Sequence, residues 1–388
     1  MDKKALIGEI LSEIVSDARS GRGAETLRIG LMSVGSEHAS NDDAGQGELV
    51  RAASLAMSLD KSIEVVMIGP KKISDTGLAW IETGDCEADI SNGLNDAIAS
   101  NRVAGAVALH YPFPLGVTTI GRVVTPLRGK EMLIASTTGA SATDRVEAMA
   151  RNALYGVAVA KSLGIANPTV GILNVDGAPS VNRILRKLVE SGVDIRFGES
   201  VRLDGGSLLR GNDILAGAVD VCVTDTLTGN ILMKLFSSWN NGGTYETTGY
   251  GYGPSVGEGW ERTISIISRA SGAPVIANAI LYTATALRGN VQANVKKELD
   301  AVLRAGFKEM FETQHKTPGA SEPVAPPSEP TDEEIHGVDV LSIDDAVHAV
   351  WAAGIYAEAS MGCTGPVVKV PGHALERAKE AMTAAGFL

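Results

Sequence analysis

Short apolar segments alternate with segments of helical spacing from residue 27 onward. Four apolar runs have the length of buried strands: LRIGLMSVG (27–35), SIEVVMIG (62–69), AGAVALH (104–110) and MLIAST (132–137). Between them, residues 45–59 and 92–101 repeat apolar positions every three or four residues, as one face of a helix does. Strands that alternate with helices in this way predict βαβ units and a parallel sheet.

The alternation starts again near residue 145. It continues with a helix at 144–163, the strand TVGILNV at 169–175, a helix at 180–192, strands at 193–200 and 219–225, and a mostly helical stretch at 262–312. The chain is therefore predicted to be α/β, with two parallel-sheet domains and an interdomain cleft. Domain I comprises residues 1–145 with 268–312, and domain II comprises residues 146–267.

Residues 313–337 differ in kind from both predicted domains. They contain several prolines, a cluster of acids and no apolar periodicity, which is typical of a linker. Residues 338–388 then form a small tethered βαβα unit, expected as a strand at 338–343, a helix at 344–359, a turn, a strand at 367–370 and a helix at 373–385.

Composition and charge exclude several classes of partner. The 388 residues carry a formal net charge of −12, and only 4% are aromatic, so neither nucleic acid nor an anionic membrane is expected as the main partner. No apolar run reaches membrane-spanning length. Residues 1–20 have the pattern of an amphipathic helix rather than of a signal peptide, so a cytoplasmic protein is expected.

Three cysteines, Cys86, Cys222 and Cys363, stand far apart without metal-ligand spacing, so we expect neither a disulfide framework nor a zinc site. The glycine-rich segment 249–259 lacks the dinucleotide-binding spacing, and no cofactor or metal is expected.

The most informative stretch is RGNDILAGAVDVCVTDTLTGNILMK (210–234). Its pattern predicts a strand that ends at Asp225, a Thr/Gly loop, and a helix that starts near Asn230. Such a junction directs backbone N–H groups and a helix N-terminus toward a ligand, which suits phosphate or a thioester oxygen. An ordinary βα turn has the same pattern, and the residues alone leave both interpretations open.

This stretch resembles the phosphate acyltransferase family of phospholipid synthesis. Residues matching the family motif are Asp225, Thr228, Gly229, Asn230 and Lys234, whereas Thr226 and Leu227 replace its glycine and phenylalanine. The resemblance implies that Thr228, Gly229, Asn230 and Lys234 bind the phosphate or acyl group.

A second segment, GPSVGEGWERTISIISRASG (253–272), is similar to phosphotransacetylases. That similarity implies catalytic and phosphate-binding roles for Ser268 and Arg269, and a phosphotransacetylase/isocitrate-dehydrogenase-like fold. The acid that the family carries downstream has no counterpart near Val275, which leaves the general base unassigned.

The segment MGCTGP (361–366) places Cys363 between small residues at the expected end of a helix. Nucleophilic thiols need such access. A small residue packed at a helix end explains the pattern equally well, and the negative end of a helix dipole raises a thiol pKa.

The acyltransferase-like core, the linker and this tail together resemble the component C α subunits of glycine/sarcosine/betaine reductase complexes. The resemblance implies an oligomeric enzyme that forms acetyl phosphate by phosphorolysis of an acetyl thioester carried on Cys363. Its implied partners are the component C β subunit, the selenoprotein component A, inorganic phosphate and the acetyl thioester. Two alternatives remain: a stand-alone phosphate acyltransferase acting on carrier-protein or coenzyme A thioesters, and a non-catalytic scaffold subunit.

Overall fold

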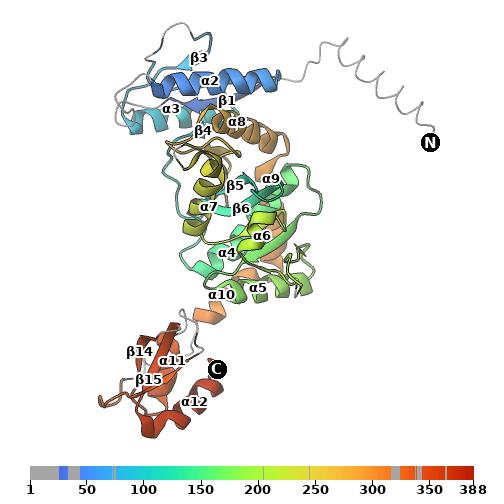
Figure 1. Cartoon of the computed structure of the whole chain (residues 1–388). Helices are drawn as coiled ribbons and strands as arrows, with labels where there is room; N and C mark the ends of the chain where they lie inside the picture. The colour runs from blue at the N-terminus through green and yellow to red at the C-terminus, as the bar shows by residue number, and fades with distance from the viewer. Residues whose placement is uncertain are drawn as a thin grey trace, which may run out of the picture. The chain divides into compact units, whose positions relative to one another are not determined.

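In the computed structural model, the chain forms two compact units, and each is described by itself. The described residues are 26–33, 44–71, 73, 76–203, 205–243, 245–315, 324–336, 338, 343–362 and 365–388. The larger unit comprises Met1–Asn174 with Ala178–Ala305, and the smaller one comprises Val175–Gly177 with Gly306–Leu388 (Figure 1). The amphipathic helix expected at 1–20 and the thiol of Cys363 lie outside the described residues.

The larger unit is built on one sheet that contains twelve strands among its described residues, and the α/β class is confirmed. The order is β3-β2-β1-β4-β12-β11-β5-β6-β10-β7-β8, with β9 paired to β7. The strands are β1 (Leu27–Met32), β2 (Ile63–Ile68), β3 (Ala79–Ile81), β4 (Gly105–Ala108), β5 (Val117–Val124), β6 (Glu131–Ala140), β7 (Thr169–Leu173), β8 (Arg196–Phe197), β9 (Leu208–Leu209), β10 (Val221–Val223), β11 (Gly253–Gly257) and β12 (Ile264–Ile266).

Two parallel sets of strands meet in the middle of this sheet. β3, β2, β1, β4 and β12 run parallel to one another, as do β6, β10, β7 and β8. β11 and β5 join the sets, because β11 is antiparallel to both β12 and β5, and β5 is antiparallel to β6. The predicted division of this region into two domains stays a prediction.

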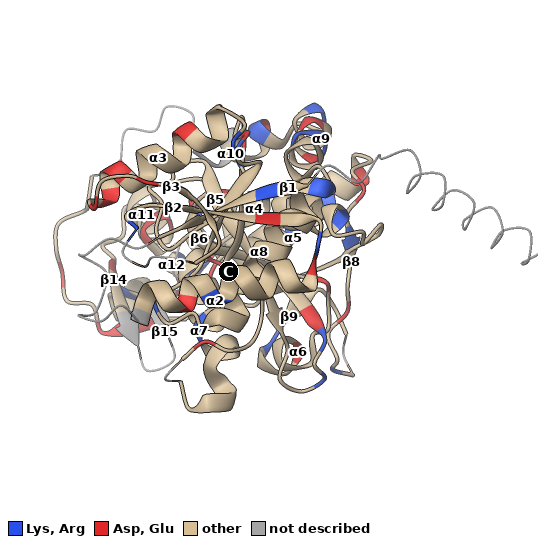
Figure 2. Ribbon diagram, turned by 90° about the horizontal axis from the view of Figure 1, so that it is seen from above, with Lys and Arg blue, Asp and Glu red and all other residues tan. Residues whose placement is uncertain are grey.

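Helices surround the sheet (Figures 1 and 2). They are α2 (Ala44–Leu59), α3 (Glu87–Ala99), α4 (Arg145–Ser162), α5 (Ala178–Glu190), α6 (Gly211–Ala216), α7 (Thr226–Ser238), α8 (Ala273–Arg288) and α9 (Val291–Arg304). α4 is buried on nearly all sides and begins where the carboxylate of Asp144 accepts the amide hydrogen of Glu147 at 2.8 Å. One core cluster packs α2 and α8 against β1 and β2, around Ile29, Leu31, Val65 and Ile280. Lys/Arg and Asp/Glu are interspersed on the helices and loops (Figure 2).

The expected strands at 27–35, 62–69, 104–110, 132–137, 169–175 and 219–225 are present as β1, β2, β4, β6, β7 and β10. The stretch 262–312 is mostly helical, as expected, with α8, α9 and the start of α10 (Phe307–His315), and it opens with the short strand β12 at Ile264–Ile266. The glycine-rich segment 249–259 contains β11, and neither β11 nor β5 was expected. No described helix is long and apolar enough to cross a bilayer.

The smaller unit contains α10 (Phe307–His315), β13 (Glu333–Ile335), α11 (Ile343–Ala352), β14 (Glu358–Gly362), β15 (Gly365–Val370) and α12 (Leu375–Ala384). Its sheet is antiparallel in the order β13-β15-β14. Its core, formed around Val350, Ala357, Val368, Ala378 and Met382, is separate from that of the larger unit. β13 lies within the predicted linker and pairs with β15.

The helix expected to run to residue 359 ends at Ala352 instead. Gly354 adopts a left-handed backbone with φ of 74°, which ends helices readily because glycine has no Cβ. The next strands, β14 and β15, pair antiparallel up to Gly362 and Gly365. The expectation that Cys363 stands at the end of a helix concerns a residue outside the described ones.

Candidate active site

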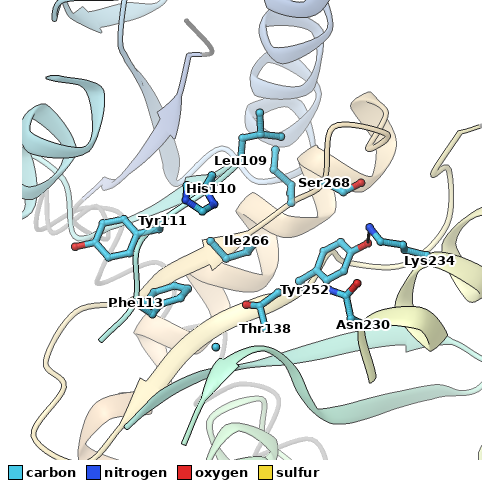
Figure 3. Close-up of a pocket in the computed structure, with 12 residues that line it drawn as sticks. Leu109, His110, Tyr111, Phe113, Thr138, Asn230, Lys234, Tyr252, Ile266 and Ser268 are labelled. Atoms are coloured by element: carbon cyan, nitrogen blue, oxygen red, sulfur yellow. Dashed lines mark hydrogen bonds between the residues drawn. The ribbon is translucent and has the colours of Figure 1, made fainter. Parts of the chain in front are cut away.

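A pocket of about 350 Å³ opens in the larger unit (Figure 3). It is lined by residues that follow β4 and β12, by the end of β6, by α7 and by the residue preceding β11: Leu109, His110, Tyr111, Phe113, Thr138, Gly139, Asn230, Lys234, Tyr252, Ile266, Ile267 and Ser268. Figure 3 shows the polar side chains Asn230, Lys234 and Ser268 around Tyr252, with Tyr111 and Phe113 across the pocket. The pocket thus pairs a polar wall with an apolar one.

The β10–α7 junction positions the polar wall. Asp225 is the N-cap of α7, and its carboxylate accepts the amide hydrogen of Thr228 at 3.1 Å and the hydroxyl of Thr228 at 2.6 Å. The helix therefore starts at Thr226, and the expectation of a Thr/Gly loop before a helix start near Asn230 was wrong. An aspartate cap satisfies the first-turn amides and so favours helix over loop. The amide of Gly229 donates to the Asp225 carbonyl at 3.0 Å, so it is engaged within the helix.

Gly229 and Asn230 dock α7 on β6. A Cβ on Gly229 would stand 1.8 Å from the carbonyl oxygen of Ser136, so only glycine permits this approach. The Asn230 amide donates to the Thr137 carbonyl at 3.0 Å. Together these contacts set the orientation of α7, and with it the place of Lys234.

Lys234 is the lysine of the pocket wall. Its ammonium donates to the hydroxyl of Tyr252 at 3.0 Å and lies 5.1 Å from the centre of that ring. The Tyr252 hydroxyl in turn donates to the carboxylate of Glu246 at 2.8 Å. Burial, reinforced by the charge of Glu246, raises the pKa of Tyr252, so its phenol keeps its proton. Hydrogen bonds thus link the Lys234 cation, the neutral Tyr252 phenol and the Glu246 carboxylate in a chain.

Glu246 also anchors the loop that carries Ser268. Its carboxylate accepts the hydroxyl of Ser271 at 2.6 Å, and the Ser271 oxygen accepts the amide hydrogen of Ser268 at 3.0 Å. Main-chain hydrogen bonds join Glu246 to Ala270 at 2.8 Å and to Gly272 at 2.9 Å. Glu246 is only 2% exposed. An acid therefore lies beside Ser268 in space although it precedes Ser268 in sequence, whereas Val275 is a fully buried core residue.

An aromatic cluster fixes the apolar wall. The rings of Tyr111 and Phe113 are 5.0 Å apart, and Phe113 meets Trp260 edge-on at 6.0 Å. The Tyr111 hydroxyl donates to Asn95 at 2.7 Å, and Arg262 donates to the same Asn95 oxygen at 2.9 Å. These bonds hold the wall in one conformation. At its rim, His110 lies 3.0 Å from the carboxylate of Glu87.

The structure brings together three residues predicted from the sequence, Asn230, Lys234 and Ser268. Thr228 and Gly229 stand in the first turn of α7 behind the lining, and Arg269 is exposed next to Ser268 without lining the pocket. Cys363 lies outside the described residues. Sequence reasoning missed Tyr252 and Glu246. Tyr252 stood in the glycine-rich segment 249–259, but no local pattern distinguishes Glu246.

Among the described residues, no group of three or more His, Cys, Asp or Glu side chains is arranged to hold a metal ion. What the pocket offers chemically is one ammonium group, amide and hydroxyl groups, and an adjoining buried carboxylate. Such a set binds an oxyanion and donates hydrogen bonds to a carbonyl oxygen.

Comparisons with known proteins extend these observations. Residues 27–369 match the family described as "Fatty acid synthesis protein". The chain is 47% identical over 391 residues to the glycine/sarcosine/betaine reductase complex component C subunit alpha of Peptoclostridium acidaminophilum, an alignment that covers 100% of this chain and 99% of that protein.

Similarity to phosphate acyltransferases is more limited in extent. Identity to the Thermotoga maritima enzyme is 30% over 231 residues, covering 50% of this chain and 65% of the enzyme. Identity to the Brucella suis enzyme is 31% over 189 residues, covering 47% and 52%. The similarity to the component C subunit thus extends through the smaller unit as well.

Proposed function

The chain belongs to the fatty acid synthesis protein family, and from that premise we propose that it forms acetyl phosphate as the α subunit of component C in a glycine/sarcosine/betaine reductase complex. The observation that carries the proposal is the pocket, in which Lys234, Asn230 and Ser268 face an apolar wall. A pocket that binds inorganic phosphate beside a small acyl thioester needs a cationic side for the phosphate and an apolar side for the acyl group.

In the proposed reaction, a phosphate oxygen attacks the carbonyl carbon of an acetyl thioester. The new C–O bond forms, the C–S bond breaks, and the proton of the phosphate passes to the departing sulfur. Lys234 balances the phosphate charge, and the Ser268 hydroxyl donates to the carbonyl oxygen as it gains charge. Arg269 adjoins Ser268 at the pocket edge, and we propose that it turns inward to bind phosphate in the loaded enzyme.

We propose that Cys363 carries the acetyl group and moves between component A and this pocket. Cys363 stands in sequence between β14 and β15 of the smaller unit, which has a core of its own. The component C β subunit and component A are the proposed partners in an oligomeric assembly. A thiol carrier needs a reducing compartment, which supports a cytoplasmic location.

Thiol labelling of the purified full-length chain tests the carrier role. Burial raises the pKa of Cys222 to about 12, so Cys222 should stay unlabelled by iodoacetamide in the native protein. Cys86 is exposed and serves as the reference thiol. We expect Cys363 to react faster than Cys86, and acetylation of the complex to block it. Equal rates at Cys363 and Cys86 would contradict a carrier thiol.

Acetyl phosphate formation tests the pocket. The reconstituted complex should convert an acetyl thioester and phosphate to acetyl phosphate, trapped as the hydroxamate. Lys234→Ala should lower the rate about 100-fold or more, as loss of an electrostatic catalytic contact does, while Lys296→Ala on α9 should leave it unchanged. Full activity of Cys363→Ser on soluble coenzyme A thioesters would favour the stand-alone acyltransferase. Full complex turnover with Lys234→Ala would favour the scaffold.

A further inference from the structure

Glu246 is a buried carboxylate to which neither the family motif nor the pocket lining assigns a role. It is 2% exposed, and burying a charged carboxylate is costly unless hydrogen bonds and an opposite charge compensate it. Its two oxygens accept from two hydroxyls, Tyr252 at 2.8 Å and Ser271 at 2.6 Å. The burial of the Glu246 carboxylate therefore points to a function for this side chain.

Those two hydroxyls lead to two different residues of the polar wall. Through Tyr252, Glu246 reaches the Lys234 ammonium on α7, and through Ser271 it reaches the backbone of Ser268 after β12. The two pocket residues come from elements far apart in sequence. Glu246 is the group that both hydrogen-bond paths share.

We propose that Glu246 is a positioning residue, which acts through Tyr252 and Ser271 to hold Lys234 and Ser268 in the mutual arrangement that phosphate attack on the acyl group needs. The Lys234 ammonium donates to the Tyr252 hydroxyl at 3.0 Å, and the Tyr252 hydroxyl donates its own proton to Glu246. A phenol that donates to a carboxylate is a better acceptor for a cation, because hydrogen bonds in a chain polarise one another. The place of Lys234 then depends on a charge that never touches substrate.

The chain contains a matched control for this arrangement. Tyr250 donates its hydroxyl to Glu131, Arg122 forms an ion pair with Glu131, and the Arg122 guanidinium lies 4.1 Å from the Tyr250 ring centre. The chemical groups are again a cation, a phenol and a carboxylate. None of these three residues lines the pocket. Glu131→Gln and Tyr250→Phe therefore remove the same kinds of bond elsewhere in the same unit.

The first test measures the chemical reactivity of the Lys234 amine and needs no assay of enzymatic activity. Trace acetylation with acetic anhydride, mapped by peptide, compares Lys234 with Lys296 and Lys297, which are exposed on α9. In Glu246→Gln and Tyr252→Phe, we expect Lys234 to react about threefold faster or more, because a hydrogen bond to a charged group is lost or weakened. The reference lysines should not change, and neither control variant should change Lys234. An unchanged Lys234 rate in both test variants would overturn the proposal.

The second test rests on the proposed function and uses the reconstituted complex. Glu246→Gln should lower kcat for acetyl phosphate formation about tenfold, the scale expected for misplacing a catalytic group. The KM for phosphate should rise less than about threefold, because removing a carboxylate near an anion site also removes repulsion. Glu246→Asp should recover part of kcat. A merely structural glutamate would instead lower the melting temperature while leaving the kcat of the folded fraction intact.

A double-mutant cycle tests whether Glu246 acts through Lys234. Because Glu246 acts partly through Lys234, Glu246→Gln should lower kcat less in a Lys234→Ala background than in the parent, with the Ser268 path accounting for the rest, and full additivity would overturn the proposal. Tyr252→Phe keeps the Glu246–Ser271 bond and serves if Glu246→Gln does not fold. If the wild-type complex forms no acetyl phosphate, the proposed function fails, while the labelling result still decides the position of Lys234.

Discussion

At the scale of single residues, Gly229 shows how a motif position acquires a structural reason. Its match to the acyltransferase motif suggested contact with phosphate, yet its amide hydrogen bonds within α7 and its α-carbon packs on β6. Glycine is required at position 229 because α7 approaches β6 closely there, and not because the residue contacts a ligand. The residues that the pocket exposes, Asn230 and Lys234, follow on the same helix.

We therefore predict that Gly229→Ala destabilises the larger unit and disturbs the pocket together. The new Cβ would overlap the Ser136 carbonyl, so α7 must shift, at a cost of about 1–3 kcal/mol typical of overpacking. Denaturant unfolding measures the loss. The control is Gly211→Ala in the first turn of α6, where an added Cβ meets nothing within 4 Å. Equal stability of the two variants would contradict this account of Gly229.

The site was only partly predictable at this scale. Lys234 and Asn230 could be found because they share one helix with the motif that resembles a family. Glu246 and Tyr252 could not, because what makes them notable is a hydrogen-bond path to Ser271 and Lys234 that only tertiary packing creates. A lone glutamate among threonine and tyrosine has no local periodicity or spacing to distinguish it.

At the scale of elements, the strands that could be predicted were mostly apolar runs such as β2 and β10, because parallel sheets bury such strands on both faces. β5, β11 and β12 were not predicted because threonine, serine or glycine interrupts their apolar residues, although all three strands are buried almost throughout. Hydroxyl pairs satisfy them, for example Thr119 with Thr137 at 2.8 Å and Ser265 with Thr283 at 2.7 Å. Such pairing is invisible in one strand taken alone.

A charged contact ties the turn between α2 and β2 to the end of α8. Asp60 accepts from the amide of Ser62 at 2.9 Å, from its hydroxyl at 2.6 Å, and from Arg288 at 2.7 Å. The Ser62 hydrogen bond and then Arg288 lower the pKa of Asp60 from 3.8 to about 2. Since the folded pKa lies below the unfolded one, the stabilisation is complete above about pH 4 and is lost as the pH falls toward 2.

Asp60→Asn should therefore be less stable than the parent at pH 7, by about 1 kcal/mol for a partly exposed pair. The difference should shrink steadily between pH 4 and pH 2, where the parent carboxylate also becomes protonated. Urea unfolding at several pH values measures it, with Asp300→Asn on the exposed face of α9 as the control. A difference that stays constant across this range would contradict a role for the Asp60 charge.

At the scale of the whole molecule, the two units have separate cores. The cluster around Ile29, Val65 and Ile280 contains residues of the larger unit, and the cluster around Val350 and Val368 contains residues of the smaller one. Separate cores imply that a loss of packing in one unit need not unfold the other. A carrier thiol on its own folded unit would retain its local geometry while that unit moves, which is what the proposed transfer from component A needs.

Val368→Ala should accordingly destabilise the smaller unit alone. Val368 is fully buried at the centre of its sheet, paired with both Ile335 and Ala359, so truncation should cost about 1–3 kcal/mol in lost burial and cavity formation. Hydrogen exchange read peptide by peptide should show faster opening in β13, β15 and α11 and unchanged protection in β1 and α8. Val65→Ala, in the core of the larger unit, should give the reverse pattern. If Val368→Ala accelerated exchange equally in both units, they would unfold as one cooperative body, and the thiol would be carried on a fixed part of the enzyme rather than on a moving one.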